Sequence, residues 1–396
     1  MATAILDLEF ENLPVEITGL ERYNKALVLI RLSGRPVGQA LLPVFGGRIG
    51  AREMHSTLMN AAGWTMWERW LHDFLGWDNA CTTNYVPPLA TVAVCTRDRT
   101  EDLQRCLEAL MQLPDDGQEV LIIDNCPSND STRRLVESYS RVRYVREDRP
   151  GLDVARNRAL REARHEIVAF TDDDAAPDPL WLRGLLRNFD DPLVLCVTGL
   201  TMPLELETEA QEWFEHLSTF GRGFRRTMFE CSNLSPMAAG KVGAGVNMAL
   251  RRKVLECVGA FDEALDTGTP TLSGGDTEMF SRILASGYRI VYDPAALCWH
   301  RHRRTWKELY RTFYGYGVGV YAYWTRSLLV EGELSVLQFA CQWFFRYQLL
   351  ALVRSLLRRP DSAPLDLILA ELRGCATGPW AYLKSRKLLR TKNRQT

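Results

Sequence analysis

The sequence predicts an α/β fold in which helices cover both faces of a mainly parallel β-sheet. Short apolar runs rich in β-branched residues recur in the middle of the chain, and each is typical of a buried strand. These predicted strands cover residues 91–96, 119–124, 142–145 and 166–171. Helical patterns separate them and begin near Thr100, Ser131, Leu152 and Pro179. Strands that alternate with helices form parallel sheets, whose ligands bind at the carboxyl ends of the strands.

Length and composition are those of an ordinary globular protein. The chain has 396 residues, of which 46% are hydrophobic and 24% are charged, and this excludes disorder as its main state. The net charge of -1 provides no global field that would attract nucleic acid. The 10 cysteines are scattered without a C-x-x-C pair, and the start shows no signal-peptide pattern. We therefore expect reduced thiols and a cytoplasmic location.

Three regions differ in their residue patterns. Residues 1–88 carry two apolar runs around Ser33-Gly34-Arg35-Pro36, which predict a β-hairpin, then a tryptophan-rich helix at about 64–77 and a break at Pro87-Pro88. Residues 89–304 hold the alternating strands and helices. Residues 305–396 have a helical pattern that becomes basic toward its end. We predict one structural unit for each region.

The C-terminal region combines apolar residues with positive charge. Residues 334–353 are mostly apolar, but three glutamines and Arg346 interrupt them, so they predict an amphipathic segment and not a transmembrane helix. From Arg346 to Thr396 we count 11 basic and 3 acidic residues, a surplus of 8 positive charges. This pattern favours peripheral contact with the inner face of a membrane.

Three consecutive carboxylates, Asp172, Asp173 and Asp174, follow the predicted strand 166–171. They repel one another unless a cation lies among them. Asp172 and Asp174 face the same side if strand geometry continues, and this spacing suits Mg²⁺ or Mn²⁺, whose coordination the phosphate oxygens of a substrate complete. The ordinary alternative is an acidic loop that caps the following helix.

Other polar residues follow neighbouring strands at the same edge. Thr96 and Arg97 end the first strand and Asp124 ends the second, at the place where a nucleotide docks in such folds. Arg156 lies in the first turns of a helix, where an arginine can clamp a diphosphate. The structural alternatives are a turn residue for Asp124 and a solvated arginine paired with Asp153 for Arg156.

Two more motifs come later in the chain. The glycines of Ser273-Gly274-Gly275 leave room for a ligand before Asp276, which begins a predicted helix and is a candidate general base. His300 stands with His302 and three arginines and is a candidate metal ligand, while the arginines are candidates to meet phosphate. A helix cap at Asp276 and a solvated basic loop around His300 are the ordinary explanations.

In this order the motifs resemble those of the family-two glycosyltransferases of GT-A fold, over about residues 90–320. The motifs are Cys95-Thr96-Arg97-Asp98-Arg99, Ile123-Asp124-Asn125, Ala155-Arg156-Asn157-Arg158-Ala159-Leu160, Phe170-Thr171-Asp172-Asp173-Asp174, Gly275-Asp276-Thr277-Glu278 and Trp299-His300. The resemblance implies a Rossmann-like sheet and a divalent cation, Mn²⁺ or Mg²⁺, as cofactor. It also implies inverting transfer of a sugar from a nucleotide-diphosphate sugar to a hydroxyl of a glycan, a lipid-linked molecule or a small molecule, in glycan or cell-envelope synthesis.

The resemblance implies roles for single residues. Asp276 matches the base that deprotonates the acceptor hydroxyl, Asp124 the acid that reads the nucleotide base, and Arg156 a helix-borne arginine near the donor. Asp172 and Asp174 match a D-x-D pair, the first near the ribose or the metal and the second on the metal. Thr96 and Arg97 match residues at the first-strand edge of the nucleotide pocket. His300 matches a histidine late in the family's sequence that contacts the metal or the diphosphate.

Two departures from the family and two other classes of protein bear on this reading. Gly275 stands where the family commonly has glutamate, so we expect no accessory role of that glutamate. Thr305 stands where processive polymerases have tryptophan and the pattern contains no membrane-spanning helix, so we expect single addition. A GT-A-like module that binds a nucleotide or glycan without turnover is one alternative, but it has no need of a base such as Asp276. A haloacid-dehalogenase-type phosphohydrolase is the other, but Ala175-Ala176 departs from its signature after the acids.

Overall fold

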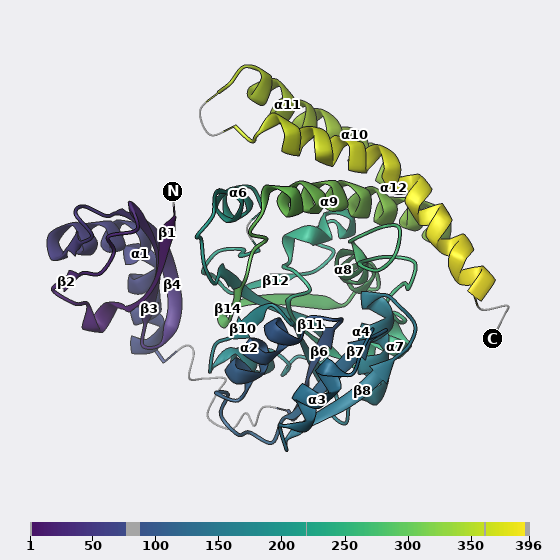
Figure 1. The fold of residues 1–396 in the computed structure, drawn as a ribbon, viewed down its shortest axis with the longest axis horizontal. Helices are drawn as coiled ribbons and strands as arrows, with labels where there is room; N and C mark the ends of the chain where they lie inside the picture. Colours follow the sequence, from purple (N-terminus) through teal and green to yellow (C-terminus); the bar gives the residue numbers. More distant parts are fainter. Residues whose placement is uncertain (1, 77–87, 219, 360–361, 393–396) are drawn as a thin grey trace.

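The computed structural model describes residues 2–76, 88–218, 220–359 and 362–392. Figure 1 shows N-terminal strands with one helix beside a central α/β domain, and C-terminal helices over the top of that domain. The cysteines in the described residues are free thiols. Cys81, the predicted helix end at Trp77 and the first proline of the predicted break at Pro87-Pro88 lie outside the described residues.

The N-terminal region contains the predicted hairpin and a strand that the sequence did not reveal. The hairpin is formed by β3 (Lys25–Leu32) and β4 (Arg35–Pro43), which pair antiparallel. β1 (Thr3–Glu9) adds to β3 in parallel, and β2 (Glu16–Ile17) pairs with β5 (Ile49–Gly50). The predicted helix start at 64 is wrong, because α1 (Ala51–Phe74) begins well before it. Met54, Leu58, Ala62 and Met66 of α1 pack in one core with the sheet.

The central sheet is mainly parallel, as predicted. Within the described residues its strand order is β10-β14-β11-β13-β9-β6-β7-β8, with β12 paired to β14. β6 pairs in parallel with both β7 and β9, whereas β13 is antiparallel to both of its neighbours. The strands are β6 (Ala90–Thr96), β7 (Glu119–Asn125), β8 (Val142–Glu147), β9 (Ile167–Asp172), β10 (Ala175–Pro177), β11 (Val194–Pro203), β12 (Thr227–Phe229), β13 (Asn247–Arg251) and β14 (Arg289–His300).

Helices cover both faces of this sheet. Residues of α2 (Thr100–Leu110), α3 (Ser131–Glu137) and α5 (Trp181–Leu186) share one apolar core with the sheet, and residues of α4 (Leu152–Glu162), α7 (Val254–Cys257) and α8 (Gly275–Ala285) share the other. The predicted starts of α2, α3 and α4 are confirmed. The predicted start at Pro179 is wrong, because Asp178 Oδ1 accepts the Leu180 N–H in a turn and α5 begins only at Trp181.

The N-terminal sheet packs on the central domain. Leu27 and Leu29 of β3 share an apolar cluster with Leu200 of β11 and Leu297 of β14. Arg31 Nη2, beside this cluster, donates to Asp178 Oδ2 at 2.6 Å. The two regions are therefore joined by a buried contact and an ion pair, while the boundary at residues 88 and 89 stays a prediction.

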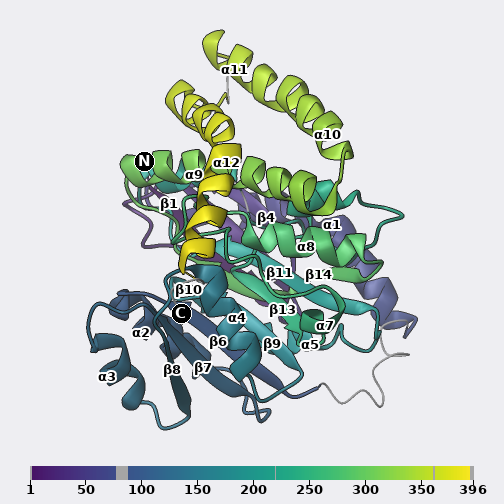
Figure 2. The same ribbon diagram turned by 90° about the vertical axis from the view of Figure 1, so that its right-hand side faces the viewer.

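The C-terminal helices are held by close glycine contacts. α9 (Trp306–Arg326) lies against α12 (Leu365–Lys392), and a Cβ atom on Gly317 of α9 would lie 2.1 Å from the backbone oxygen of Glu371. Between them come the π-helical η3 (Ser327–Glu331), α10 (Ser335–Trp343), the π-helical η4 (Phe344–Gln348) and α11 (Leu349–Leu356). Figure 2 shows α10 and α11 extending from the body above α9. Among the described helices, none is long and apolar enough to cross a membrane.

Candidate active site

Three potential metal ligands meet at the carboxyl edge of the central sheet. Asp172 ends β9, Asp173 and Asp174 form the turn into β10, and His300 is the last residue of β14. The antiparallel pairing of β10 with β14 sets Ala175 opposite His300. Ligand atoms of Asp172, Asp174 and His300 therefore lie within 4.8 Å of one another. The condition that strand geometry continues is not met, because Asp173 and Asp174 form a turn; that turn and the pairing of β10 with β14 bring these groups together.

Asp174 is buried among cations. Arg99 Nη2 and Arg303 Nη1 donate to its Oδ2 at 2.8 and 3.1 Å, and His300 Nε2 lies 3.2 Å from its Oδ1. Burial alone would raise the pKa of Asp174, but His300, Arg99 and Arg303 together hold it well below the usual range. Asp174 is therefore an anion, and its buried Oδ1 has no hydrogen-bond partner among the described residues.

The other two acids of the turn have different surroundings. Burial, followed by repulsion from Asp174, raises the pKa of Asp172. Thr96 Oγ1 and Arg99 Nη1 donate to the two oxygens of Asp173 at 2.8 and 2.6 Å. Burial nevertheless raises the pKa of Asp173 to about 7, against the effect of Arg99. The contacts of Asp173 with Thr96 and Arg99 thus hold the turn in place. Asp172 and Asp174 lie close to His300.

A chain of hydrogen bonds leads from His300 into the protein. His300 Nδ1 lies 3.1 Å from His302 Nδ1, and His302 Nε2 lies 2.9 Å from Glu215 Oε2 of α6 (Glu209–Leu217). Burial lowers the pKa of His302 well below its usual value, so this imidazole is neutral. His302 thus joins His300 to Glu215, and Nε2 is the ring nitrogen of His300 that faces Asp174.

Asp276 lies in the first turn of α8, as predicted. The Gly245 N–H donates to its Oδ2 and the Thr277 N–H to its Oδ1, each at 2.7 Å. Gly274 precedes the helix with φ +102°, and a Cβ atom there would lie 2.8 Å from the backbone oxygen of Gly319. The glycine at 274 thus permits both the turn and its contact with α9. Two backbone donors fix the orientation of the Asp276 carboxylate.

A second carboxylate fills the space beside Asp276. A Cβ atom on Gly275 would lie 1.9 Å from Asp153 Oδ2, so no side chain fits at position 275 while Asp153 keeps this place. Arg156 Nη1 donates to Asp153 Oδ1 at 3.0 Å and to Asp266 Oδ2 at 2.7 Å. Arg156 is buried, which differs from the solvated arginine considered above. The pairing with Asp153 does occur, and it lies inside the site.

Asp124 and Arg97 lie at the ends of the neighbouring strands. Tyr144 Oη donates to Asp124 Oδ2 at 2.8 Å, while the buried Asp124 Oδ1 has no partner among the described residues. Burial raises the pKa of Asp124. Arg97 is exposed at the end of β6, and its Nε lies 4.0 Å from Asp98 Oδ2. An unpaired buried oxygen at a strand end is a polar group that a ligand can satisfy.

Sequence reasoning assigned no role to three members of this network. They are Arg99 and Asp266, which act through ion pairs, and Glu215, which reaches His302 from α6. Among these three, Arg99 carried a usable signal, since it lies two residues after Arg97 at the same strand end. Glu215 precedes His302 by 87 positions, and no local pattern joins them.

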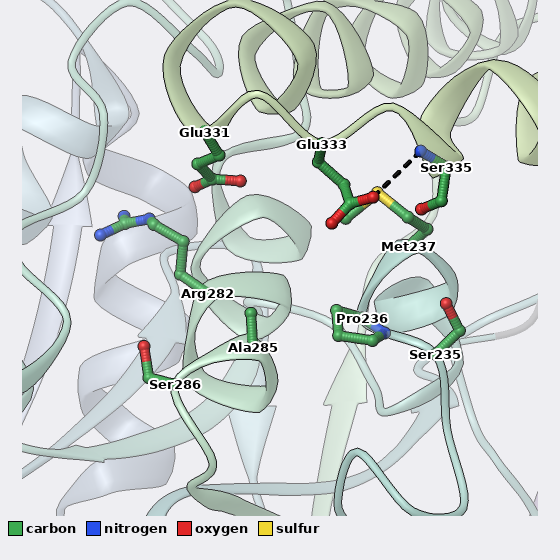
Figure 3. A pocket seen from close by; sticks show the side chains of 9 residues that line it. All are labelled: Ser235, Pro236, Met237, Arg282, Ala285, Ser286, Glu331, Glu333 and Ser335. Carbon is green, nitrogen blue, oxygen red and sulfur yellow. Dashed lines mark hydrogen bonds between the residues drawn. The ribbon is translucent and has the colours of Figure 1, made fainter.

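A surface pocket of about 290 Å³ lies apart from these groups. It is lined by Ser235, Pro236, Met237, Arg282, Ala285, Ser286, Glu331, Glu333 and Ser335. Figure 3 shows it between α8 and the start of α10, with Arg282 and the two glutamates at its rim. None of the predicted site residues lines it.

The central part of the chain is similar to known glycosyltransferases. Residues 91–259 match the Glycosyl transferase family 2 profile. The chain is 27% identical over 233 residues to the Pre-mycofactocin glycosyltransferase of Mycobacterium tuberculosis, covering 57% of this chain and 46% of that protein. It is 24% identical over 246 residues to the Probable glycosyltransferase YdaM of Bacillus subtilis, covering 57% of this chain and 53% of that protein. The chain thus spans about half the length of these curated relatives.

A solved structure shares the fold. It is the mannosyltransferase PcManGT from Pyrobaculum calidifontis, in complex with GDP-Man and Mn²⁺, with a TM-score of 0.50 and 18% identity over 78% of this chain and 94% of that chain. The mixed α/β architecture is therefore that of GT-A glycosyltransferases. The profile match over residues 91–259 shows that the central part of the chain is similar to family 2 glycosyl transferases.

Proposed function

We propose that the protein is a metal-dependent, inverting glycosyltransferase that uses a nucleotide-diphosphate sugar. The observation that carries this proposal is the meeting of Asp172, Asp174 and His300 within 4.8 Å at the carboxyl edge. Asp276 Oδ2 and Arg156 Nη2 both adjoin Gly245, and the positive charge of Arg156 opposes the rise in the pKa of Asp172. Metal ligands and a candidate base are thus parts of one charged network.

The residues present fit a divalent cation. Two carboxylates and an imidazole suit Mn²⁺ or Mg²⁺, and the unpartnered Asp174 Oδ1 is a buried oxygen that a cation would satisfy. When bound, the cation neutralises the negative charge of the leaving diphosphate. Arg303, whose side chain is 43% exposed beside Asp174, adds a positive charge that a phosphate can reach.

Asp276 acts on the acceptor in this proposal. Its carboxylate takes the proton of the acceptor hydroxyl, whose oxygen forms the new bond to the anomeric carbon as the bond to the diphosphate breaks. One displacement of this kind inverts the anomeric centre. Asp124, with its free Oδ1, is suited to accept an N–H of the nucleotide base, and Thr96 and Arg97 lie at the adjoining strand end. Arg156 fixes Asp153 and Asp266 around the donor site.

The relatives support the class of reaction and not its details. Single addition to a glycan, lipid-linked or small-molecule hydroxyl, a role in cell-envelope synthesis and a cytoplasmic location remain proposals. The donor bound by PcManGT, GDP-Man, belongs to that protein. For this chain it is one member of a panel to be tested.

The experiment is donor turnover followed by proton NMR. The protein is incubated with each nucleotide sugar and Mn²⁺, and water serves as acceptor where no other is known. The proposal expects a released sugar whose first-formed anomer is opposite to that of the donor, and no release by Asp276→Asn. Release with retention would contradict the inverting displacement, and turnover unchanged by chelator would contradict the metal.

A further inference from the structure

The C-terminal arm, which we define as Ser335–Leu356 (α10, η4 and α11), contacts the body through one face. Trp324 of α9 lies against Phe339 and Trp343, with ring centroids 5.5 and 6.3 Å apart. Gln348 Nε2 donates to Cys375 Sγ of α12 at 2.9 Å. Val336 and Gln348 are the buried residues of this fully described segment. The arm is therefore attached to α9 and α12, and most of its residues are exposed or half-buried. Figure 2 shows α10 and α11 extending from the body.

The accessible surface of the arm is apolar where a surface helix is ordinarily polar. Phe345 is 63% exposed, Leu356 60% and Leu337 55%. Tyr347, Leu350 and Val353 are exposed as well. Exposed apolar side chains gathered on one element mark a surface that something covers.

The charges of the arm indicate what covers it. The arm contains Arg346 and Arg354, and Arg358 and Arg359 follow it directly; all four are exposed, and residues 334–360 contain no acidic residue. A second copy of the arm would bring positive charges against positive charges. An anionic lipid surface matches both the exposed apolar side chains and the positive charge. The apolar side chains would contact the acyl chains, and the arginines would bind the lipid phosphates.

We propose that the C-terminal arm docks in the headgroup layer of an anionic phospholipid membrane. Trp380 of α12, which is 64% exposed with Lys384 Nζ 5.0 Å from its ring centroid, extends the same combination of apolar and basic groups beyond the arm. The docking does not depend on the proposed glycosyl transfer.

The test is vesicle flotation with the full chain, in chelator and without donor. Vesicles of phosphatidylcholine alone are compared with vesicles that also contain phosphatidylglycerol. The proposal expects binding to the anionic vesicles only. It expects Arg354→Glu to lower partitioning about fivefold or more and Phe345→Ser about tenfold. The matched controls are Arg161→Glu on α4 and Trp64→Ser on α1, both exposed positions away from the arm, which leave binding unchanged.

Three results would overturn the proposal. Equal binding to neutral vesicles would remove the role of the arginines, and full binding by both arm variants would move the contact elsewhere. A dimer in light scattering that Phe345→Ser converts to a monomer would show that a second copy covers the arm. Circular dichroism of each variant checks its folding. Donor turnover is measured separately, so a failure of docking and a failure of glycosyl transfer give different results.

Discussion

The carboxyl edge of the central sheet and the C-terminal arm use arginine in opposite ways. At the edge, Arg99, Arg156 and Arg303 each hold a buried carboxylate, with the shortest contacts at 2.6, 2.7 and 3.1 Å. On the arm, the arginines belong to a stretch without any acid. The arginines at the edge are each paired with a buried carboxylate, because burying a charge without a partner is costly. These ion pairs hold the site residues in place. Uncompensated charge beside exposed apolar residues points instead to a partner outside the protein.

The largest effect is expected from Asp276→Asn. The neutral amide keeps an acceptor oxygen for one of the two backbone donors and loses the acceptor for the other. It cannot take a proton, so transfer falls about 10²–10⁴-fold while donor affinity is kept. Steady-state turnover and donor titration measure the two effects. Asp190→Asn, an exposed position of the same domain, is the control. Loss of donor affinity with normal turnover of bound donor would refute the assignment of Asp276 as base.

Removal of one proposed metal ligand tests the carboxyl edge itself. Asp174→Asn removes the anion between Arg99 and Arg303, and we expect Mn²⁺ affinity to fall by about 100-fold or more, beyond the effect of losing an outer partner. Titration of Mn²⁺ by electron paramagnetic resonance gives the affinity directly. Asp172→Asn, at a proposed ligand without those ion pairs, separates metal loss from damage to the fold. Unchanged Mn²⁺ affinity in both variants would contradict the metal site.

A substitution between α9 and α12 tests how the arm is supported. Gly317→Ala places a Cβ atom 2.1 Å from the Glu371 backbone oxygen, so the helices must separate, at a cost of about 1–3 kcal/mol in the free energy of unfolding. Urea unfolding measures this cost. In Gly63→Ala the new Cβ atom would lie 3.5 Å from Met59 Cε, an ordinary contact, so this helical control keeps its stability. Equal stability of the two variants would show that the close approach is not required.

Glu215 tests the hydrogen-bond chain behind His300. Glu215→Leu removes the acceptor for His302, and loss of such an outer partner weakens Mn²⁺ binding about 10-fold. Glu215→Gln keeps an acceptor oxygen and is expected to recover part of that affinity. Glu209→Leu, an exposed position of the same helix, is the control. Equal Mn²⁺ affinity in Glu215→Leu and wild type would show that Glu215 does not position His300.

The smallest effect is a pH dependence of stability. Burial raises the pKa of Glu215 to about 8, so between about pH 4.5 and 8 the folded state holds a proton that the unfolded state has released. This contribution to stability is present below the unfolded pKa and is lost as the pH rises through 8. Glu215→Gln removes it, so the melting temperature of the variant relative to wild type should rise from pH 5 to pH 8.5 in chelator. Parallel melting curves across this range would contradict the raised pKa.

Local patterns predicted what depends on local sequence. The four central strands, the starts of α2, α3 and α4, and the position of Asp276 in the first turn of a helix follow from apolar runs and turn residues. The meeting of Asp172 and Asp174 with His300 was expected from the resemblance, although the turn at Asp173 and the pairing of β10 with β14 produce it.

Contacts between distant segments were beyond local patterns. β1 pairs with β3 in parallel, although other residues separate the two strands in the sequence. Turn residues predict hairpins, and they do not predict a parallel pairing of this kind. Asp153 fills the space beside Gly275, and Glu215 reaches His302 from another helix. These contacts depend on tertiary packing, so only the folded structure shows why glycine stands at position 275.

The central claim is a metal-dependent donor site, and a thermal-shift screen tests it most directly. Nucleoside diphosphates and nucleotide sugars are each added with Mn²⁺, Mg²⁺ or chelator. Selective binding to the folded state raises the melting temperature by mass action, so we predict that one nucleotide stabilises the protein with metal and not with chelator. Asp174→Asn should abolish this shift. Absence of a shift with every nucleotide, or a shift that chelator leaves unchanged, would contradict the account.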